Sequence, residues 1–441
     1  MGLIRALSLT LTLSLSLNLG WPLTLAWASE GHWDLWTCYQ AALKQDPVLK
    51  SAEATRWANR AIMREKQALL LPNVEATVST SANRASQLSP HYNAPAYSLT
   101  LIQPLIAFSS WADARYGRHL DEQAALSYAS AEQDLIFRVA EAYFDLLKTL
   151  DALEAAQSER VAFERYLDQG QQRFKAGLIA VTDVDIAKAR RDNAKAVEIA
   201  ARNAIEDQRG VLQALVDQAV CRIAPLKSEL PLVEPSPNKE VEWTCQALKE
   251  NYDLNLARLS LTLARDTLRK NDFEHIPTVS VGATLNKQPF VGGGPMIRAT
   301  QASASLSLTI PIYAGGGTQA MAEESRFWYR KSASDLERQH RETERLTQQY
   351  FRGIYSQIAQ VGALKQAVAS NRVALKATQA SFEAGTRTIV DVLNGESDLA
   401  RSQKDYKAAN YDYVLQGLRL KRMAASLCPE DLKAINAWLR P

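Results

Sequence analysis

The sequence predicts an internally duplicated α+β membrane protein, and two observations support this prediction. Four segments alternate apolar and polar residues with the period of two that is typical of β-strands. Long stretches with helical heptad spacing follow each pair of these segments. Strands of about ten residues with one apolar and one polar face are what a membrane barrel with a wet interior requires. We therefore expect a strand region that continues into a long helical region.

Residues 1–28 are predicted to be a secretory signal peptide. Arg5 supplies a positive charge, an apolar stretch follows, and Ala26-Trp27-Ala28 has the small-x-small pattern of a cleavage site. The alternative is a transmembrane helix, which Gly20 and Pro22 disfavour because they interrupt the apolar stretch. No later stretch reaches the ~18 apolar residues that a membrane helix needs. The mature chain is therefore expected to be exported and to span a membrane, if at all, by strands.

The rest of the chain divides into two predicted repeats, 29–230 and 231–441. Short motifs recur in the two halves at nearly constant separation. The matching pairs are Ala42-Leu43-Lys44 with Ala247-Leu248-Lys249, Leu71-Pro72-Asn73-Val74 with Ile276-Pro277-Thr278-Val279, and Phe174-Lys175-Ala176-Gly177 with Phe382-Glu383-Ala384-Gly385. A duplication explains this agreement better than chance.

Each repeat contains two predicted strands. Their expected bounds are about 72–84 and 96–107 in the first repeat, and about 277–287 and 299–312 in the second. The alternation places Val279 and Val281 on one face and Ser280 on the other. Four strands cannot close a membrane barrel, because the smallest have about eight. The chain must therefore borrow strands from copies of itself.

The helical part of each repeat is predicted to be a long hairpin. The range 111–177 contains no proline and would span roughly 100 Å as a single helix. Its heptad seam consists of Leu135, Val139, Ala142, Leu146, Thr149 and Leu153. The hairpins are expected to turn near 177–182 and 385–390, where a glycine ends each first helix. The alternative, a coiled coil with unrelated short strands, is disfavoured by alternation in all four strand segments.

Four cysteines are present in a chain expected to be exported, so they can oxidise. Cys38 and Cys245 each lie near the first helix of a repeat, and Cys221 and Cys428 each follow the last one. Because the head and tail of the repeats should meet at mid-height, we predict the bridges Cys38–Cys428 and Cys221–Cys245. Four cysteines allow three connectivities, and the other two stay open.

The composition does not indicate an enzyme, a metal site or a nucleic-acid-binding protein. The net charge is +3, and the five histidines are scattered without a recognisable metal or catalytic motif. The range 314–318 resembles a phosphate loop but lacks its Gly-Lys-Ser/Thr ending. We therefore expect no catalytic residue, no cofactor and no nucleic-acid partner.

Residues at the helical turns resemble those of the TolC family of outer-membrane channel-tunnels. The resemblance is carried by 173–178 with 181–184, by 385–393, and by 308–316 at a strand-to-helix junction. It implies a homotrimer whose twelve-stranded barrel lies among outer-membrane lipid of a Gram-negative cell and continues as a tapering helical tunnel into the periplasm. It also implies passive export of toxic small molecules or secreted proteins. A periplasmic adaptor would couple the channel to an inner-membrane pump of the ABC, RND or MFS type.

A trimeric outer-membrane coiled-coil adhesin or scaffold without transport is the alternative. The polar strand faces disfavour it, because serine and threonine suit a water-filled lumen and serve no purpose in a sealed stalk.

By the same resemblance, Thr182, Asp183, Phe382 and Arg387 are the candidate gate residues, which tie neighbouring hairpins together. Phe382 departs from the family pattern, which has tyrosine there, so the closed state should depend more on an Asp183–Arg387 pair. The alternative is that Thr182 and Asp183 only cap the returning helix.

Two further sets of residues follow from the resemblance. Asp391 and Asn394 match the positions of two acidic rings at the tunnel entrance, and the asparagine predicts weaker cation selectivity and weaker block by trivalent cations. Asp391 has an alternative role in the first turn of a helix. Adaptor docking at the helical turns would involve Gly177, Leu178, Gly385 and Thr386. The alternative for the two glycines is a helix C-cap.

Overall fold

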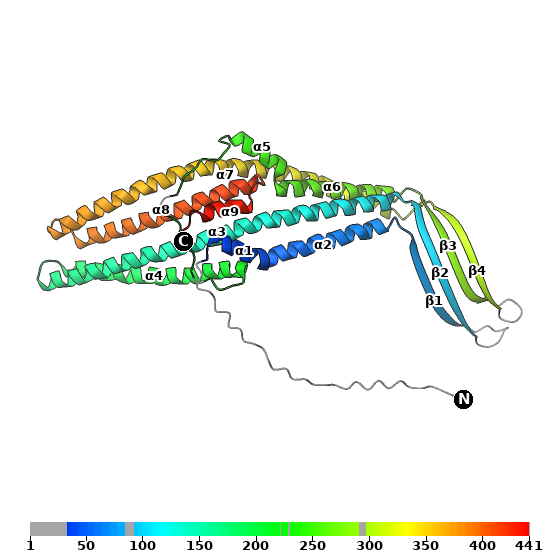
Figure 1. The fold of residues 1–441 in the computed structure, drawn as a ribbon, viewed down its shortest axis with the longest axis horizontal. Helices are drawn as coiled ribbons and strands as arrows, with labels where there is room; N and C mark the ends of the chain where they lie inside the picture. Colours follow the sequence, from blue (N-terminus) through cyan, green and yellow to red (C-terminus); the bar gives the residue numbers. More distant parts are fainter. Residues whose placement is uncertain (1–32, 84–91, 221, 228–229, 291–296, 441) are drawn as a thin grey trace, which may run out of the picture.

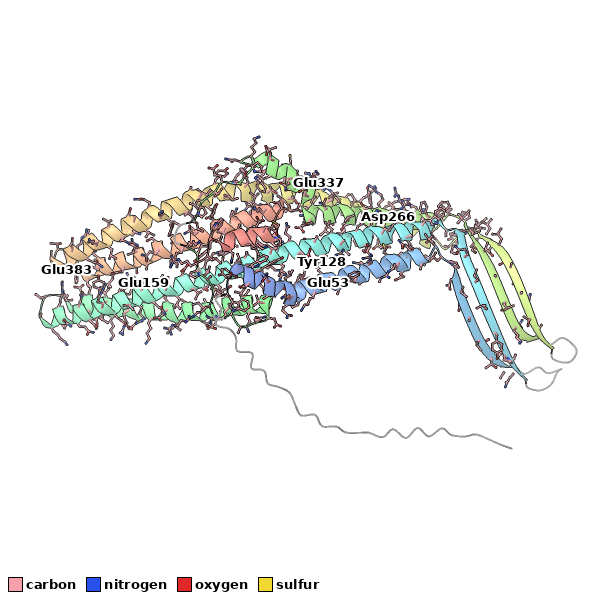
Figure 2. All side chains as sticks on the ribbon, viewed as in Figure 1. Glu53, Tyr128, Glu159, Asp266, Glu337 and Glu383 are labelled. Atoms are coloured by element: carbon pink, nitrogen blue, oxygen red, sulfur yellow. The ribbon has the colours of Figure 1, made fainter. Side chains whose placement is uncertain are left out.

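The computed structural model describes residues 33–83, 92–220, 222–227, 230–290 and 297–440. The molecule is elongated, with a small β-sheet at one end and two long helical hairpins that turn at the other (Figure 1). Glu383 lies at the hairpin end, far from the sheet (Figure 2). The predicted signal peptide lies outside the described residues.

The two repeats have the same order of elements. In the first repeat they are α1 (Leu35–Gln45), α2 (Pro47–Ala68), β1 (Asn73–Asn83), β2 (Tyr92–Ile106), α3 (Phe108–Lys175) and α4 (Val181–Val216). In the second they are α5 (Glu240–Glu250), α6 (Tyr252–Phe273), β3 (Thr278–Phe290), β4 (Ile297–Thr309), α7 (Gly317–Glu383), α8 (Ile389–Met423) and the added α9 (Pro429–Asn436).

The four strands form one antiparallel sheet in the order β1-β2-β3-β4. β2 starts at Tyr92, earlier than predicted, and β4 ends at Thr309, before the predicted 312. The register places apolar residues beside apolar ones across strands, as in Val78 with Tyr97 and Val281 with Leu306. Polar residues align in the same way on the other face.

The long helices pack in a fixed order around the body. In the half near the sheet, contacts run from α2 to α3, α6 and α7. In the other half they run from α4 to α3, α8 and α7. The predicted heptad seam is internal: Leu135, Val139 and Leu146 are buried. Burial of this seam between long helices stabilises the hairpins far more than helix propensity does.

The main core lies at mid-length, where α1, α9 and the segment between the repeats pack against α3. Trp33 pairs with Ile223, and Leu226 pairs with Leu439. The hydroxyl of the buried Tyr143 on α3 donates to the carbonyl oxygen of Ala224 at 2.7 Å. The heads and tails of the two repeats therefore meet here.

The predicted Cys38–Cys428 bridge is wrong, because both cysteines are free thiols. Cys38 points into the core, and burial raises the pKa of its thiol to about 12. Cys428 precedes α9, and its thiol donates to a carboxylate oxygen of Asp431 at 3.5 Å. Proximity of the chain ends does not orient the two side chains toward each other. Cys245 is also a free thiol. Its predicted partner Cys221 lies outside the described residues, so the Cys221–Cys245 bridge stays a prediction.

None of the described helices combines the length and the apolar character needed to cross a bilayer.

Candidate functional site

Both lateral edges of the four-stranded sheet are open in the described part of the chain. β1 and β4 are the outer strands of the sheet, so each has one row of backbone groups without a strand neighbour. β1 is followed along the same edge by α2 and α4, whereas β4 is followed by α7. Apolar side chains on α4 are exposed, among them Val197 and Ile199. One edge is therefore suited to meet the other edge of a second copy.

The sheet has one exposed apolar face and one polar face. The exposed apolar side chains of the first face include Val74, Val78, Tyr97, Leu99, Leu101, Leu285, Leu306 and Leu308. Val78 is 72% exposed and Leu306 70%, although water solvates such side chains poorly. The opposite face pairs Ser98 with Asn286 and Thr284 with Ser303. This sheet is two-sided in the sense that a lipid boundary and an aqueous lumen require.

Both hairpin turns are C-capped by glycine in the Schellman geometry. Gly177 has φ 71° and Gly385 φ 76°, values that favour glycine. The N–H of Leu178 donates to the carbonyl of Arg173, and that of Thr386 to the carbonyl of Ser381, both at 2.9 Å. A Cβ at either glycine would meet no heavy atom within 4 Å. The glycines are thus required by backbone conformation, and the surface around them is open.

Thr182 and Asp183 are not the N-cap of the returning helix. α4 begins at Val181 after Ala180, which provides no side-chain cap. Asp183 lies in the first turn, where its negative charge is favoured by the helix dipole. Within the described part of the chain its side chain has no hydrogen-bond or ion-pair partner. The carboxylate is therefore available to a cation from outside this chain.

Arg387 lies in the other turn and does not contact Asp183 within the chain. Its Nη1 is 3.8 Å from an oxygen of Asp391, and its side chain is largely exposed. Asp391 and Thr388 form a capping box at the start of α8. Hydrogen bonds from the backbone and hydroxyl of Thr388 hold the pKa of Asp391 below its usual range. Asp391 thus has the helix-starting role that was the alternative, and it carries a charge at neutral pH.

Phe382 is buried beneath the turns and contacts the other hairpin. The Cζ atom of Arg173 lies 4.1 Å from the centroid of the Phe382 ring. The Nη1 of Arg173 also donates to the carbonyl oxygen of Phe382 at 3.3 Å. Tyr166 packs against the same ring with its own ring nearly perpendicular, at a centroid distance of 6.5 Å. Arg173 was part of a recognised motif, but no feature of the sequence assigned it a partner.

Asn394 is exposed near the start of α8 and accepts a hydrogen bond from Arg190 of α4 at 3.2 Å. Arg190 was not among the predicted site residues, because helical periodicity does not reveal contacts between the two hairpins. The structure thus brings Asn394 to the first hairpin, whereas Asp391 bonds within its own turn.

No group of three His, Cys, Asp or Glu side chains within the described ranges is placed to hold an ion. The single close His–carboxylate pair among these ranges is His119 with the buried Asp266, at 2.6 Å, which joins α3 to α6.

Comparisons with known proteins agree with this geometry. The model of the outer membrane efflux protein family matches residues 38–217 and 243–426, one segment in each repeat. The chain is 31% identical to the outer membrane protein TolC of Vibrio cholerae, over 91% of this chain and 93% of that protein. It is 27% identical to the alkaline protease secretion protein AprF of Pseudomonas aeruginosa, over 90% and 86%. The solved outer membrane protein VceC of Vibrio cholerae superposes with a TM-score of 0.76 at 16% identity, covering 88% of this chain and 95% of that one.

Proposed function

The chain belongs to the outer membrane efflux protein family, and from that premise we propose that three copies of it form one continuous conduit from the periplasm to the cell exterior. It is an outer-membrane channel for efflux or secretion that extends into the periplasm. Transport through it is passive. Its cargo is toxic small molecules or secreted proteins supplied by other components.

The observation that carries the trimeric conduit is the four-stranded sheet with two open edges, one apolar face and one polar face. Pairing β4 of one copy with β1 of the next satisfies the open backbone groups, which are costly to leave unpaired in lipid. Three copies give twelve strands, with the apolar face toward lipid and the polar face toward the lumen. A sealed stalk would gain nothing from the polar face.

The same assembly places the candidate gate between subunits. α4, with Asp183, lies on one edge, and the turn with Arg387 follows α7 on the other. In a closed ring, Asp183 of one subunit meets Arg387 of the next. An exposed ion pair of this kind contributes about 0–1 kcal/mol, so three copies give a weak lock that a partner can open. Without a tyrosine hydroxyl at position 382, this pair carries more of the closed state.

The opening partner is a periplasmic adaptor that also contacts an inner-membrane pump of the ABC, RND or MFS type. The Schellman turns offer it an exposed surface: Leu178 is 72% exposed, and there is space beside Gly177 and Gly385. Thr386 follows Gly385 in the second turn and belongs to the same surface.

Single-channel recording of the purified protein in planar bilayers tests this function. We expect discrete channels of low conductance, and a larger conductance or open probability for Arg387→Ser. Arg338→Ser serves as the matched control, because this arginine is also exposed and faces a carboxylate of its own helix, Asp335, at 3.7 Å. Channels that ignore Arg387→Ser would discard the gate and keep the conduit. A folded trimer that forms no channels would favour the structural scaffold.

A further inference from the structure

We propose that Arg173 is a positioning residue for gating, which holds the two hairpins of one subunit together at their turns through its contact with Phe382. The inference rests on the proposed function, because it assumes that the hairpin ends close a channel. It adds a link within each subunit to the Asp183–Arg387 link between subunits.

The contact combines two interactions on one aromatic residue. The guanidinium of Arg173 lies over the face of the Phe382 ring at 4.1 Å, closer than any other cation over an aromatic ring among the described residues. Phe382 is only 4% exposed and Arg173 is half-buried, so the cation–π attraction acts in a partly desolvated place. Tyr166 packs against the same ring, with the two ring planes nearly perpendicular.

The second interaction satisfies a helix end. Phe382 lies in the last turn of α7, where carbonyl oxygens have no partner within the helix. Arg173 donates to its carbonyl at 3.3 Å, while the N–H of Gly385 donates to the same oxygen at 3.1 Å. A cation at this position is also favoured by the dipoles of both helices, because Arg173 itself lies in the last turn of α3.

The position of the contact makes it relevant to gating. Among the hydrogen bonds and cation–π pairs of the described residues, it is the link between the hairpins that lies nearest to both turns. The bond from Gln379 to the hydroxyl of Tyr166, at 2.8 Å, lies further from the turns. A movement that separates the two turns therefore breaks the Arg173–Phe382 contact.

The ring of Phe382 explains how this subunit closes without a hydroxyl at that position. Phenylalanine has no group that could bond Asp183, but its ring face attracts the guanidinium. Phe382 therefore acts within its own subunit, and Asp183 stays free for the arginine of the neighbouring subunit. Loss of the Arg173–Phe382 contact should shift the opening equilibrium about fivefold per subunit, or on the order of a hundredfold if three subunits open together.

Planar-bilayer recording of open probability in purified trimers tests the inference with Arg173→Gln and Arg173→Met. The first keeps a hydrogen-bond donor without charge, and the second keeps only the packing of the stem. We expect both to raise open probability at least tenfold, with Arg173→Met the stronger. The control is Arg330→Gln, which removes an arginine stacked at 5.5 Å on Phe327 of its own helix and joins no hairpins. It should leave open probability unchanged.

A double-mutant cycle with Phe382→Leu separates gating through this contact from a general loss of packing. Leucine keeps the burial but removes the ring face, so Arg173→Gln should add little to Phe382→Leu. Phe382→Tyr keeps the ring face and should retain the effect of Arg173→Gln. Additive effects in the leucine background would overturn the inference. So would wild-type gating in both Arg173 variants, or their failure to form trimers, since the residue would then serve assembly. A wild-type trimer without channels would instead overturn the proposed function.

Discussion

Replacing Asp46 by asparagine should destabilise the protein through loss of one buried ion pair. Asp46 is 1% exposed and accepts hydrogen bonds from Arg138 Nη1 at 3.1 Å and Nη2 at 2.8 Å. It also caps α2 by accepting the N–H of Leu49 at 2.8 Å. Asparagine can keep that cap, as Asn251 does at the corresponding position of the second repeat by accepting from Leu254 at 3.0 Å. The variant therefore isolates the pair with Arg138.

The size of the destabilisation by Asp46→Asn depends on which interactions Asp46 and Arg138 lose. Breaking a fully buried pair costs about 3–5 kcal/mol. Here Arg138 is 24% exposed and keeps Asp134 at 2.9 Å, so it is left with one carboxylate partner. The expected loss is that of one or two charge-assisted hydrogen bonds, about 1–3 kcal/mol in the free energy of unfolding.

The stability that the Asp46–Arg138 pair provides should also depend on pH. Burial alone would raise the pKa of Asp46, but hydrogen bonds from Arg138 and the backbone of Leu49 outweigh it and hold the pKa below its usual value of 3.8. A lowered folded-state pKa means that this stability is present above the usual value and is lost as the pH falls through the lowered one. The difference between wild type and Asp46→Asn should therefore be constant near neutral pH and shrink in acid below about pH 4.

Urea denaturation of the detergent-solubilised protein, followed by circular dichroism at pH 7 and pH 3, measures both quantities. The reciprocal variant Asn251→Asp is the matched control. Nδ2 of Asn251 donates to the carbonyl of Met423 at 3.0 Å, so a carboxylate there would face an acceptor. It should destabilise at pH 7 and recover on protonation. A cost below about 0.5 kcal/mol for Asp46→Asn, or a cost that does not change in acid, would show that the Asp46–Arg138 pair does not provide this stability.

Three further predictions concern the candidate site. In a cysteine-free background, Asp183→Cys combined with Arg387→Cys should form disulfides that link subunits, whereas each single variant should not. A disulfide formed only within one subunit would contradict the gate between subunits. Asn394→Asp should tighten block of the channel by trivalent cations on the order of tenfold. The block should tighten further when Arg190→Gln removes the neighbouring positive charge. Equal block of wild type and variant in single-channel titration would place position 394 away from the conduction path. Gly177→Asn introduces a residue that tolerates positive φ but adds bulk to the open surface. It should weaken cross-linking to the adaptor, while the melting temperature of the trimer changes little. Unaltered cross-linking would leave the glycine with its capping role alone.

Much of the fold was predictable because its signals are periodic and local. Alternation in the strands predicted four strands in one sheet, and heptad spacing predicted two long hairpins. The turn positions followed from Gly177 and Gly385, whose positive φ values no other residue adopts as readily. Local signals did not place strand ends, and so β2 begins earlier and β4 ends earlier than expected.

Contacts between elements far apart in the sequence were not predictable in the same way. The face of α3 that meets the second hairpin depends on helix rotation over many turns, so the Arg173–Phe382 contact has no local signature. The Cys38–Cys428 bridge failed for a related reason: the chain segments meet as expected, but helix α1 directs Cys38 into the core. The proposed gate role of Asp183 requires a second subunit, which no periodicity within one chain describes.

The most direct test of the trimeric conduit is electron cryomicroscopy of the purified protein in lipid nanodiscs. We expect three copies in a closed ring, with β4 of each copy hydrogen-bonded to β1 of the next and twelve strands around one lumen. We also expect α4 of one copy to pack beside α7 of its neighbour down to the turns. A particle whose β1 and β4 edges stay unpaired between copies, or whose helices enclose no continuous lumen, would contradict the trimeric conduit.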